Sequence, residues 1–407
     1  MNITEIKGGV TAAKGFEAAA AAAAIKYQGR TDMALVYSEK PCHAAGTFTT
    51  NIVKAAPVKW DQKIVKESPY AQAVIVNSGI ANACTGEEGM GYCKETAEEA
   101  AKVLGVPENA VLVASTGVIG MQLPMDRLKK GISLLKEAKG STPEHGTAAS
   151  KAIMTTDTVN KETAVQVELG GKTVTVGGMC KGAGMIMPNM ATMIAVITTD
   201  APLAAPDLSQ ALTAAVSKSF NKVTVDSDTS TNDTCFALAS GAAAPDGPAF
   251  TPGTPAFDAF QRALDQLATT LARKMAADGE GATRLITVTV RGAATADDAD
   301  AAARTVANSP LVKTAVYGHD ANWGRVAAAL GRSGARFNQE DVDIDILGLP
   351  VCRAGLVVDF DEEEALRRFE EPEVAIEVDL HAGEESATMW TCDFSHEYVT
   401  INGDYRS

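Results

Sequence analysis

Short apolar runs rich in β-branched residues recur in the first half of the chain and alternate with segments of helical periodicity. Short apolar runs bounded by turn residues are typical of buried strands, and amphipathic segments that repeat about every 3.6 residues are typical of helices. The alanine run at 18–24 is also expected to be helical, because alanine has the highest helix propensity. The expected strands are 32–39, 71–79 and 110–116, and the other expected helices are 93–105 and 124–138.

The middle of the chain continues this mixed pattern and predicts a domain of the α/β class. Two alternating runs over 163–179 flank Gly170-Gly171, which predicts a β-hairpin. Residues 241–257 are rich in proline, glycine and alanine and have no apolar period, so we expect an exposed loop there. A further strand is expected at 191–200, and helices are expected at 205–220 and 257–279.

From about residue 285 the apolar positions follow a period of two. Such alternation is typical of antiparallel sheets with one buried face. We therefore expect an α/β domain over 1–284 and a smaller C-terminal domain, with a largely antiparallel sheet, over 285–407. The alternating segments are 283–293, 341–351, 354–360, 374–383, 386–394 and 397–403.

Composition and charge narrow the function without naming it. The 407 residues carry a net charge of −15, so the chain has no electrostatic footprint for nucleic acid or an anionic membrane. No apolar stretch reaches the roughly 20 residues of a membrane helix. The seven cysteines contain no CxxC pair, which indicates reduced thiols and a cytoplasmic protein. The five histidines are scattered, so no metal site is expected.

The stretch KGAGMIMPNMATMIAVITTD, residues 181–200, carries the candidate chemistry. Thr192 could be an ordinary strand threonine, because β-branched residues favour strands. The glycines and the proline before it also allow the unusual backbone angles that attack on the Ala191 carbonyl would need. Cleavage there would leave Thr192 as a chain terminus, with its hydroxyl as nucleophile and its own amine as base. The residues alone leave both interpretations open.

The same stretch resembles the self-cleavage motif of the ornithine acetyltransferases, also called glutamate N-acetyltransferases or the ArgJ family. The number, order and spacing of further similar segments extend this resemblance nearly from end to end. It implies a layered α-β-β-α sandwich with a smaller C-terminal α/β domain. The similar segments are GGVTAAKGF (8–16), AAGTFTTN (44–51), VNSGIANACTG (76–86), VASTGVIG (113–120), AIMTTDT (152–158), VDSDTSTNDT (225–234), DGEGATR (278–284), VKTAVYGHDANWGR (312–325) and INGDYRS (401–407).

The resemblance implies a ping-pong transfer of acetyl from N2-acetyl-L-ornithine to L-glutamate in cyclic arginine biosynthesis. Autoproteolysis between Ala191 and Thr192 would expose the nucleophile, and Thr116 and Gly117 would form the oxyanion hole. From charge complementarity, Lys181 could pair with a substrate carboxylate and Glu280 with the ornithine ammonium. The residues that the resemblance assigns to substrate binding are Thr155, Lys181, Thr192, Glu280, Asn402 and Ser407.

Each of these residues also has an ordinary structural interpretation. Thr116-Gly117 could be a simple turn, and Lys181 and Glu280 could be solvated charges. Asn402-Gly403 reads as a hairpin turn, and Ser407 as a frayed terminus. Residues 225–234 have the composition of a calcium loop, but they lack its central glycine and closing glutamate.

The resemblance further implies an α chain (1–191) and a β chain (192–407) that assemble as a heterotetramer, with no cofactor. It leaves open whether acetyl-CoA is a second acetyl donor, and whether the chain serves arginine synthesis or a secondary pathway. Two other functions remain as alternatives. One is a self-cleaving aminopeptidase or amidohydrolase of related fold, and the other is a non-catalytic amino-acid-binding protein.

Overall fold

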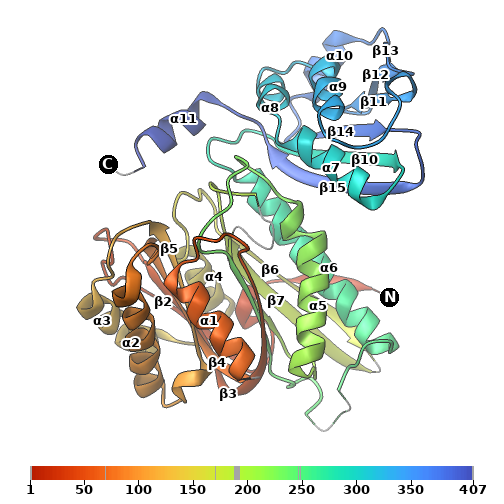
Figure 1. Cartoon of the computed structure of the whole chain (residues 1–407). Helices are drawn as coiled ribbons and strands as arrows, with labels where there is room; N and C mark the ends of the chain where they lie inside the picture. The colour runs from red at the N-terminus through yellow and green to blue at the C-terminus, as the bar shows by residue number, and fades with distance from the viewer. Residues whose placement is uncertain are drawn as a thin grey trace. The chain divides into compact units, whose positions relative to one another are not determined.

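The protein is described here by a computed structural model that covers residues 2–68, 70–169, 171–187, 193–245, 247 and 249–405 (Figure 1). These residues form two compact units, and each is described by itself. Unit 1 comprises the described parts of Met1–Gly182, Pro188–Asn221 and Thr229–Leu271. Unit 2 comprises the described parts of Ala183–Met187, Lys222–Asp228 and Ala272–Ser407. The sequence-based domain boundary at 284/285 stays a prediction.

Unit 1 is built on a mixed sheet that has nine strands within the described residues, in the order β1-β6-β7-β8-β9-β3-β4-β5, with β2 paired to β3. Strand β3 joins the two halves of this sheet, because its first half pairs with β2 and β4 and its second half pairs with β9. The strands are β1 Ile3–Ile6, β2 Phe16–Ala21, β3 Met33–Phe48, β4 Tyr70–Ile80, β5 Val111–Val118, β6 Lys161–Leu169, β7 Lys172–Lys181, β8 Ile194–Thr199 and β9 Thr234–Ala239.

The hairpin predicted around Gly171 is confirmed, since β6 and β7 pair antiparallel with Leu169 opposite Lys172. The helix predicted over 18–24 is wrong. Residues Phe16–Ala21 form β2 and pair antiparallel with β3, with Ala20 opposite Ala34. Helices α3 and α4 pack on this strand, so the small alanine side chains allow a close approach that outweighs helix propensity.

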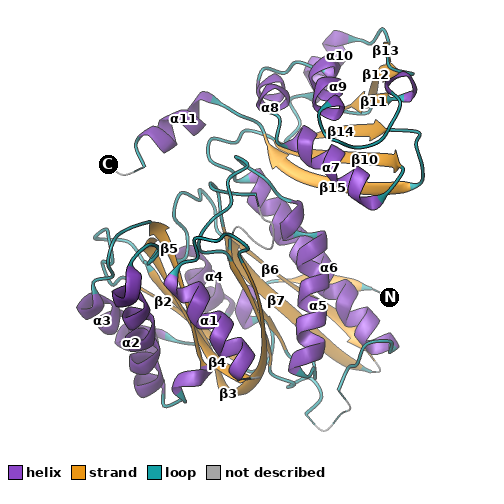
Figure 2. Ribbon diagram, viewed as in Figure 1, coloured by secondary structure: helices purple, strands orange, loops and turns teal. Residues whose placement is uncertain are grey.

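Helices cover the sheet of unit 1 (Figure 2). Helices α1 and α2 pack against β5, α3 and α4 against β2, and α5 against β3. The helices are α1 Ala56–Glu67, α2 Gly86–Leu104, α3 Met125–Ala138, α4 Pro143–Ala152, α5 Ala205–Lys218 and α6 Pro255–Ala277, with 3-10 turns at Gly9–Thr11, Glu108–Ala110 and Phe220–Lys222. This arrangement confirms the layered α/β class expected from the sequence.

Unit 2 contains a smaller sheet of the order β13-β12-β11-β14-β10-β15. The predicted antiparallel character is confirmed for most pairs, and β10 with β14 is a parallel pair. The strands are β10 Leu285–Ala293, β11 Asp343–Ile346, β12 Leu349–Arg353, β13 Leu356–Val357, β14 Glu373–Asp379 and β15 Glu385–Cys392. The helices are α7 Ala296–Ala307, α8 Pro310–Tyr317, α9 Trp323–Gly331, α10 Glu362–Arg368 and α11 His396–Gly403, with a 3-10 turn at Gln339–Asp341.

The strand predicted over 397–403 is wrong, and so is the hairpin turn at Asn402-Gly403. These residues lie in helix α11, which begins at His396. The Ser395 side chain accepts a hydrogen bond from the backbone N–H of Glu397. Such an N-terminal cap favours a helix in a segment whose apolar spacing resembles a strand.

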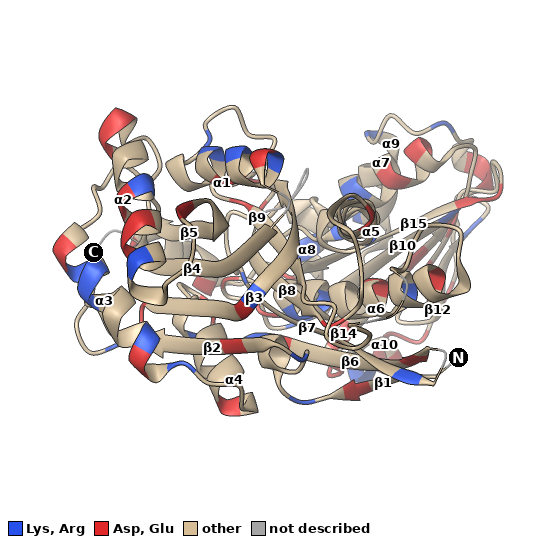
Figure 3. Ribbon diagram, turned by 90° about the horizontal axis from the view of Figure 1, so that it is seen from below, with Lys and Arg blue, Asp and Glu red and all other residues tan. Residues whose placement is uncertain are grey.

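Each unit has its own apolar core. The core of unit 1 joins residues of β2–β5 with Met179, Val196 and Phe236 from the other half of the sheet. The core of unit 2 lies between its sheet and α7, α8 and α9. Charged residues of both signs mark the helices α1 and α2, whereas β4 and β5 are almost free of charge (Figure 3). Among the helices in the described part of the chain, none is both long enough and apolar enough to cross a membrane.

Candidate functional site

Thr116 and Gly117 lie at an irregularity where the parallel pair β4–β5 ends. Gly117 is opposite Gly79, and the register shifts directly after this pair. Gly117 has φ of +129°, and a Cβ atom there would lie 2.2 Å from the Gly79 carbonyl carbon. Only glycine fits this position, because another residue would be strained and would overlap the neighbouring strand. Thr116 and Gly117 are both half-buried, and the close approach to Gly79 fixes the backbone conformation of this strand end.

Buried amide and hydroxyl groups hold this strand end in place. The Ser115 hydroxyl donates to Asn77 Oδ1 at 2.7 Å, and Asn77 Nδ2 donates to the Ile80 carbonyl at 2.9 Å. Asn232 Nδ2 donates to the carbonyls of Ala81 at 2.6 Å and Ser115 at 2.7 Å. Asn232 therefore links the ends of both strands on either side of the shifted register.

A charged cluster lies in the same unit around Asp157, which is almost fully buried. Asp157 Oδ1 accepts from Lys161 Nζ and from the Gly182 N–H, each at 2.7 Å. Its Oδ2 accepts from the Thr155 N–H at 3.0 Å and lies 3.8 Å from Lys181 Nζ. The structure thus brings together Thr155 and Lys181, two residues that the sequence assigned to substrate binding.

Two lysines dominate the electrostatics of this cluster. Burial by itself would raise the pKa of Asp157, but the charges of Lys181 and Lys161 outweigh that effect and lower it. One carboxylate thus faces two buried ammonium groups, since Lys161 is fully buried and Lys181 is nearly so. Lys181 lies in β7 and is not the solvated loop charge that its sequence context allowed. A nearly buried ammonium group such as that of Lys181 is a suitable partner for a substrate carboxylate.

Asp233 brings a second buried carboxyl group to Lys181. It follows Asn232 directly in the chain and is 1% exposed. Burial raises the pKa of Asp233 well above its usual range, and the charge of Lys181 only partly offsets this. Residues 232 and 233 therefore link the strand end at Thr116 to the charged cluster at Lys181.

Sequence reasoning singled out neither of these two residues, nor Asp157 and Lys161. Asp157, Asn232 and Asp233 lie in the segments 152–158 and 225–234, which carried the family resemblance, but among their polar residues only Thr155 had an assigned role. Polar residues next to buried strands were the available signal. Their partners are far away in sequence, so their spacing could not identify them.

Unit 2 brings together Glu280 and Asn402. Asn402 Nδ2 donates to Glu280 Oε2 at 2.7 Å, and Glu280 is only 5% exposed. Its carboxylate lies against Gly184, where a Cβ atom would be 2.3 Å from Oε2. Glu280 is therefore a buried acid whose carboxylate is fixed by a hydrogen bond from Asn402. It is not the solvated charge that its position after a helix suggested.

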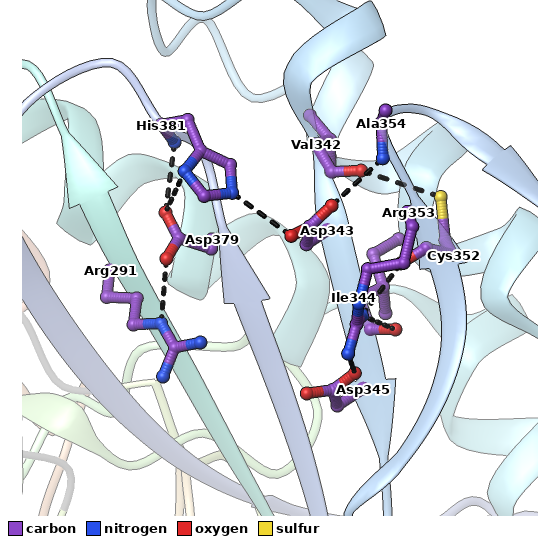
Figure 4. A network of polar contacts seen from close by, with 10 residues as sticks. All are labelled: Arg291, Val342, Asp343, Ile344, Asp345, Cys352, Arg353, Ala354, Asp379 and His381. Carbon is purple, nitrogen blue, oxygen red and sulfur yellow. Dashed lines mark hydrogen bonds and ion pairs between the residues drawn. The ribbon is translucent and has the colours of Figure 1, made fainter.

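A second cluster of unit 2 surrounds His381 on the sheet (Figure 4). His381 Nε2 lies 3.1 Å from Asp343 Oδ2, and Asp379 Oδ2 accepts from Arg291 Nε at 2.9 Å. The hydrogen bond with Asp343 raises the pKa of His381. The histidine side chain is 49% exposed, so this cluster is a solvated surface network.

Three of the predicted site residues, Ala191, Thr192 and Ser407, lie outside the described residues. No cluster of three or more His, Cys, Asp or Glu side chains suited to a metal ion occurs among the residues that the structure describes.

Comparisons with known proteins cover nearly the whole chain. The model of the ArgJ family matches residues 17–407. The arginine biosynthesis bifunctional protein ArgJ of Symbiobacterium thermophilum is 52% identical over 404 residues, with 99% of each chain covered. The protein of the same name from Caldanaerobacter subterraneus subsp. tengcongensis is 46% identical over 406 residues, again with 99% of each covered. The crystal structure of argJ from Bacillus halodurans has a TM-score of 0.51 and 43% identity, and it covers 52% of this chain and 99% of its own.

Proposed function

The chain belongs to the ArgJ family, and from this premise we propose that it transfers acetyl from N2-acetyl-L-ornithine to L-glutamate. The protein is an acyltransferase of arginine biosynthesis. The structural observation that supports this function best is the strand end at Thr116 and Gly117. Its glycine-only geometry and its buried supports form a rigid site of the kind that acyl transfer needs.

The reaction proceeds in two acyl transfers. The Thr192 hydroxyl oxygen attacks the acetyl carbonyl, the carbon–nitrogen bond breaks, and ornithine leaves with the proton on its amine. The α-amine of glutamate then takes the acetyl group from Thr192, and the hydroxyl regains its proton. A donor pair at Thr116 and Gly117 stabilises the oxyanion of each tetrahedral intermediate.

Charge complementarity pairs Lys181 and Glu280 with oppositely charged groups of the substrates. Lys181 pairs with a substrate carboxylate, because it is a nearly buried ammonium group beside Asp157. Glu280 pairs with the side-chain ammonium of ornithine, and Asn402 orients its carboxylate. Thr155, Thr192 and Ser407 complete the proposed substrate contacts.

Glu280→Gln tests the assignment at the ammonium end. The variant keeps the size of the side chain and removes its charge, so KM for acetylornithine should rise at least tenfold while KM for glutamate changes less. Steady-state kinetics with both substrates measure this difference. An unchanged KM for acetylornithine would contradict the assignment.

Chain processing is part of the same proposal. Cleavage between Ala191 and Thr192 gives chains 1–191 and 192–407, which stay associated and pair into a cytoplasmic heterotetramer. The reaction needs no cofactor. Use of acetyl-CoA as a second donor would make the protein bifunctional in the sense of its relatives' name.

Denaturing mass spectrometry of wild type beside Thr192→Ala tests this proposal directly. We expect two chains from wild type, with masses that meet at 191/192, and one intact chain from the variant. Assays with acetylornithine, glutamate and acetyl-CoA then separate acetyl recycling from synthesis. An intact wild-type chain would remove the terminal amine and the mechanism with it. Release of acetate without acetylglutamate would instead favour the amidohydrolase alternative.

A further inference from the structure

Helix α11 of unit 2 is held by contacts of single residues and not by an apolar face. None of its eight residues, all of which the structure describes, is buried. Val399 in its middle is 72% exposed. Hydrophobic burial therefore contributes little to fixing this helix, although the helix carries Asn402, one of the proposed substrate contacts. Specific polar contacts must fix it instead.

The first turn of α11 packs against the backbone beside Glu280. The Ser395 hydroxyl donates to the Gly281 carbonyl at 2.6 Å. Gly281 has φ of +71°, and a Cβ atom there would lie 2.5 Å from the Tyr398 nitrogen. Only glycine allows this close approach. The start of the helix is thus in direct contact with the segment that contains Glu280.

Asp226 ties α11 to a second segment, residues 183–187. Its Oδ2 accepts from the Met185 N–H at 2.6 Å, and its Oδ1 accepts from the Ile186 N–H at 2.8 Å. The Tyr398 hydroxyl donates to Oδ2 at 3.2 Å. All three partners are donors, as a carboxylate requires, and hydrogen bonds to a charged group are stronger than those between neutral groups. Asp226 therefore holds both residues 183–187 and α11.

The Glu280 carboxylate contacts both segments that Asp226 holds. In the first segment, a Cβ atom on Gly184 would be 2.3 Å from Glu280 Oε2. In α11, Asn402 Nδ2 donates to the same oxygen at 2.7 Å. Asn402 follows Tyr398 by four residues, so the two lie on the same face of the helix. The contacts of Asp226 therefore set the surroundings of the Glu280 carboxylate in both segments.

We infer that Asp226 and Tyr398 are positioning residues for the ammonium end of acetylornithine. They hold Glu280 and Asn402 in the arrangement that receives the side-chain ammonium, without themselves touching the substrate. This inference rests on the proposed function, because it concerns the same pairing of Glu280. Without the Tyr398 hydroxyl, α11 loses its link to Asp226, and Asn402 loses its alignment with the Glu280 carboxylate. Glutamate has no side-chain ammonium, so its binding depends less on this arrangement.

The charges around Tyr398 fit this role. Burial raises the pKa of Tyr398, and the negative charges of Asp226 and Glu280 add to the effect. The hydroxyl therefore keeps its proton and stays a donor at neutral pH. Negative charge that opposes loss of this proton also favours an ammonium group beside Glu280.

Tyr398→Phe tests the inference, because it removes only the hydroxyl and keeps the ring, which stacks on Phe394 at 4.9 Å. We expect KM for acetylornithine to rise about fivefold, while KM for glutamate and kcat change by less than about twofold. Tyr92→Phe is the matched control. Tyr92 also donates to a carboxylate, that of Glu88 at 2.5 Å, but on the exposed surface of α2. This control should leave all three constants unchanged in steady-state kinetics.

A ligand without the ammonium group shows whether the effect belongs to that group. N2-acetyl-L-norvaline has the carbon chain of acetylornithine and lacks its side-chain amine. Its apparent inhibition constant against acetylornithine should be the same in Tyr398→Phe and in wild type. Asp226→Asn weakens the same contacts and should also raise KM for acetylornithine without changing this inhibition constant.

Glu280→Gln, assayed beside these variants, separates the inference from the proposed function. An unchanged KM for acetylornithine in Tyr398→Phe, or an equal rise in the inhibition constant of acetylnorvaline, would overturn the inference. A raised KM in Glu280→Gln would then leave the proposed function intact. An unchanged KM in Glu280→Gln would overturn the assignment of the ammonium group and the inference with it.

Discussion

Two charged clusters, one around Asp157 and one around His381, both pair aspartates with basic side chains but differ in burial. In unit 1, Asp157 and Lys161 form an ion pair whose side chains are both 0% exposed. In unit 2, Arg291 pairs with Asp379 while its side chain is 58% exposed (Figure 4). Water screens the second pair, and the first must be balanced by the protein itself. Burial, more than residue type, therefore separates a candidate site from a surface network.

The difference also shows in the pKa shifts. Lys181 and Lys161 lower the pKa of Asp157 in spite of burial, so a strong local field acts there. His381 has a raised pKa, mainly from its bond with Asp343, but its ring is half-exposed. Groups with shifted pKa values in a buried cluster are good candidates for function. Exposed ion pairs also shift pKa values, but they do so without serving a function.

The largest expected effect comes from breaking the buried pair. Lys161→Met leaves the Asp157 carboxylate buried with fewer donors, and we expect it to lower the free energy of unfolding by about 3 kcal/mol. Urea unfolding followed by circular dichroism measures the change.

Arg291→Met is the matched control for Lys161→Met. It also replaces a cation by methionine beside an aspartate, but in solvent, and should cost less than about 1 kcal/mol. Equal losses in the two variants would show that burial does not set the difference between the clusters.

An intermediate effect is expected from the amide that supports the strand end. Asn232→Ala leaves the carbonyls of Ala81 and Ser115 without this donor, at a cost of about 1–3 kcal/mol. It should also lower kcat by roughly 10- to 100-fold, because Thr116 and Gly117 lose their alignment.

Gln72→Ala is the control for Asn232→Ala, because Gln72 also donates to two carbonyls, those of Ser38 and Glu39. It should reduce stability by a similar amount and leave kcat unchanged. Assays of acetyl transfer and of thermal unfolding separate the effect on kcat from the effect on stability. An equal loss of kcat in Asn232→Ala and Gln72→Ala would assign Asn232 a purely structural role.

The smallest expected effect concerns His381. Its folded-state pKa is raised, so its contribution to stability is present below the unfolded value of about 6.5 and is lost as pH rises through the folded value. Because the group is exposed, we expect only a few tenths of a kcal/mol. Wild type and His381→Gln should differ in urea midpoint at pH 5.5 and converge by pH 8.5. A difference that grows with pH would contradict this sign.

Sequence reasoning succeeded where the signal was local or was carried by many motifs together. Periodicity predicted β4, β5, the hairpin of β6 and β7, and helices α3 and α5. The family resemblance, which the comparisons confirm, named the candidate residues. The pattern failed at β2 and at α11, where packing on neighbouring helices and a serine cap outweighed the local preference.

The sequence by itself determined the mixed α/β class and the family, and with the family the proposed acetyl transfer. It could not show that Asn232 supports Ser115, or that Asp157, Lys161 and Lys181 share one buried cluster, because these contacts join distant segments. Only the tertiary structure decided which charges are removed from water. That removal sets the direction of their pKa shifts: the pKa of Asp157 is lowered by its two lysines, and the pKa of Asp233 is raised by burial.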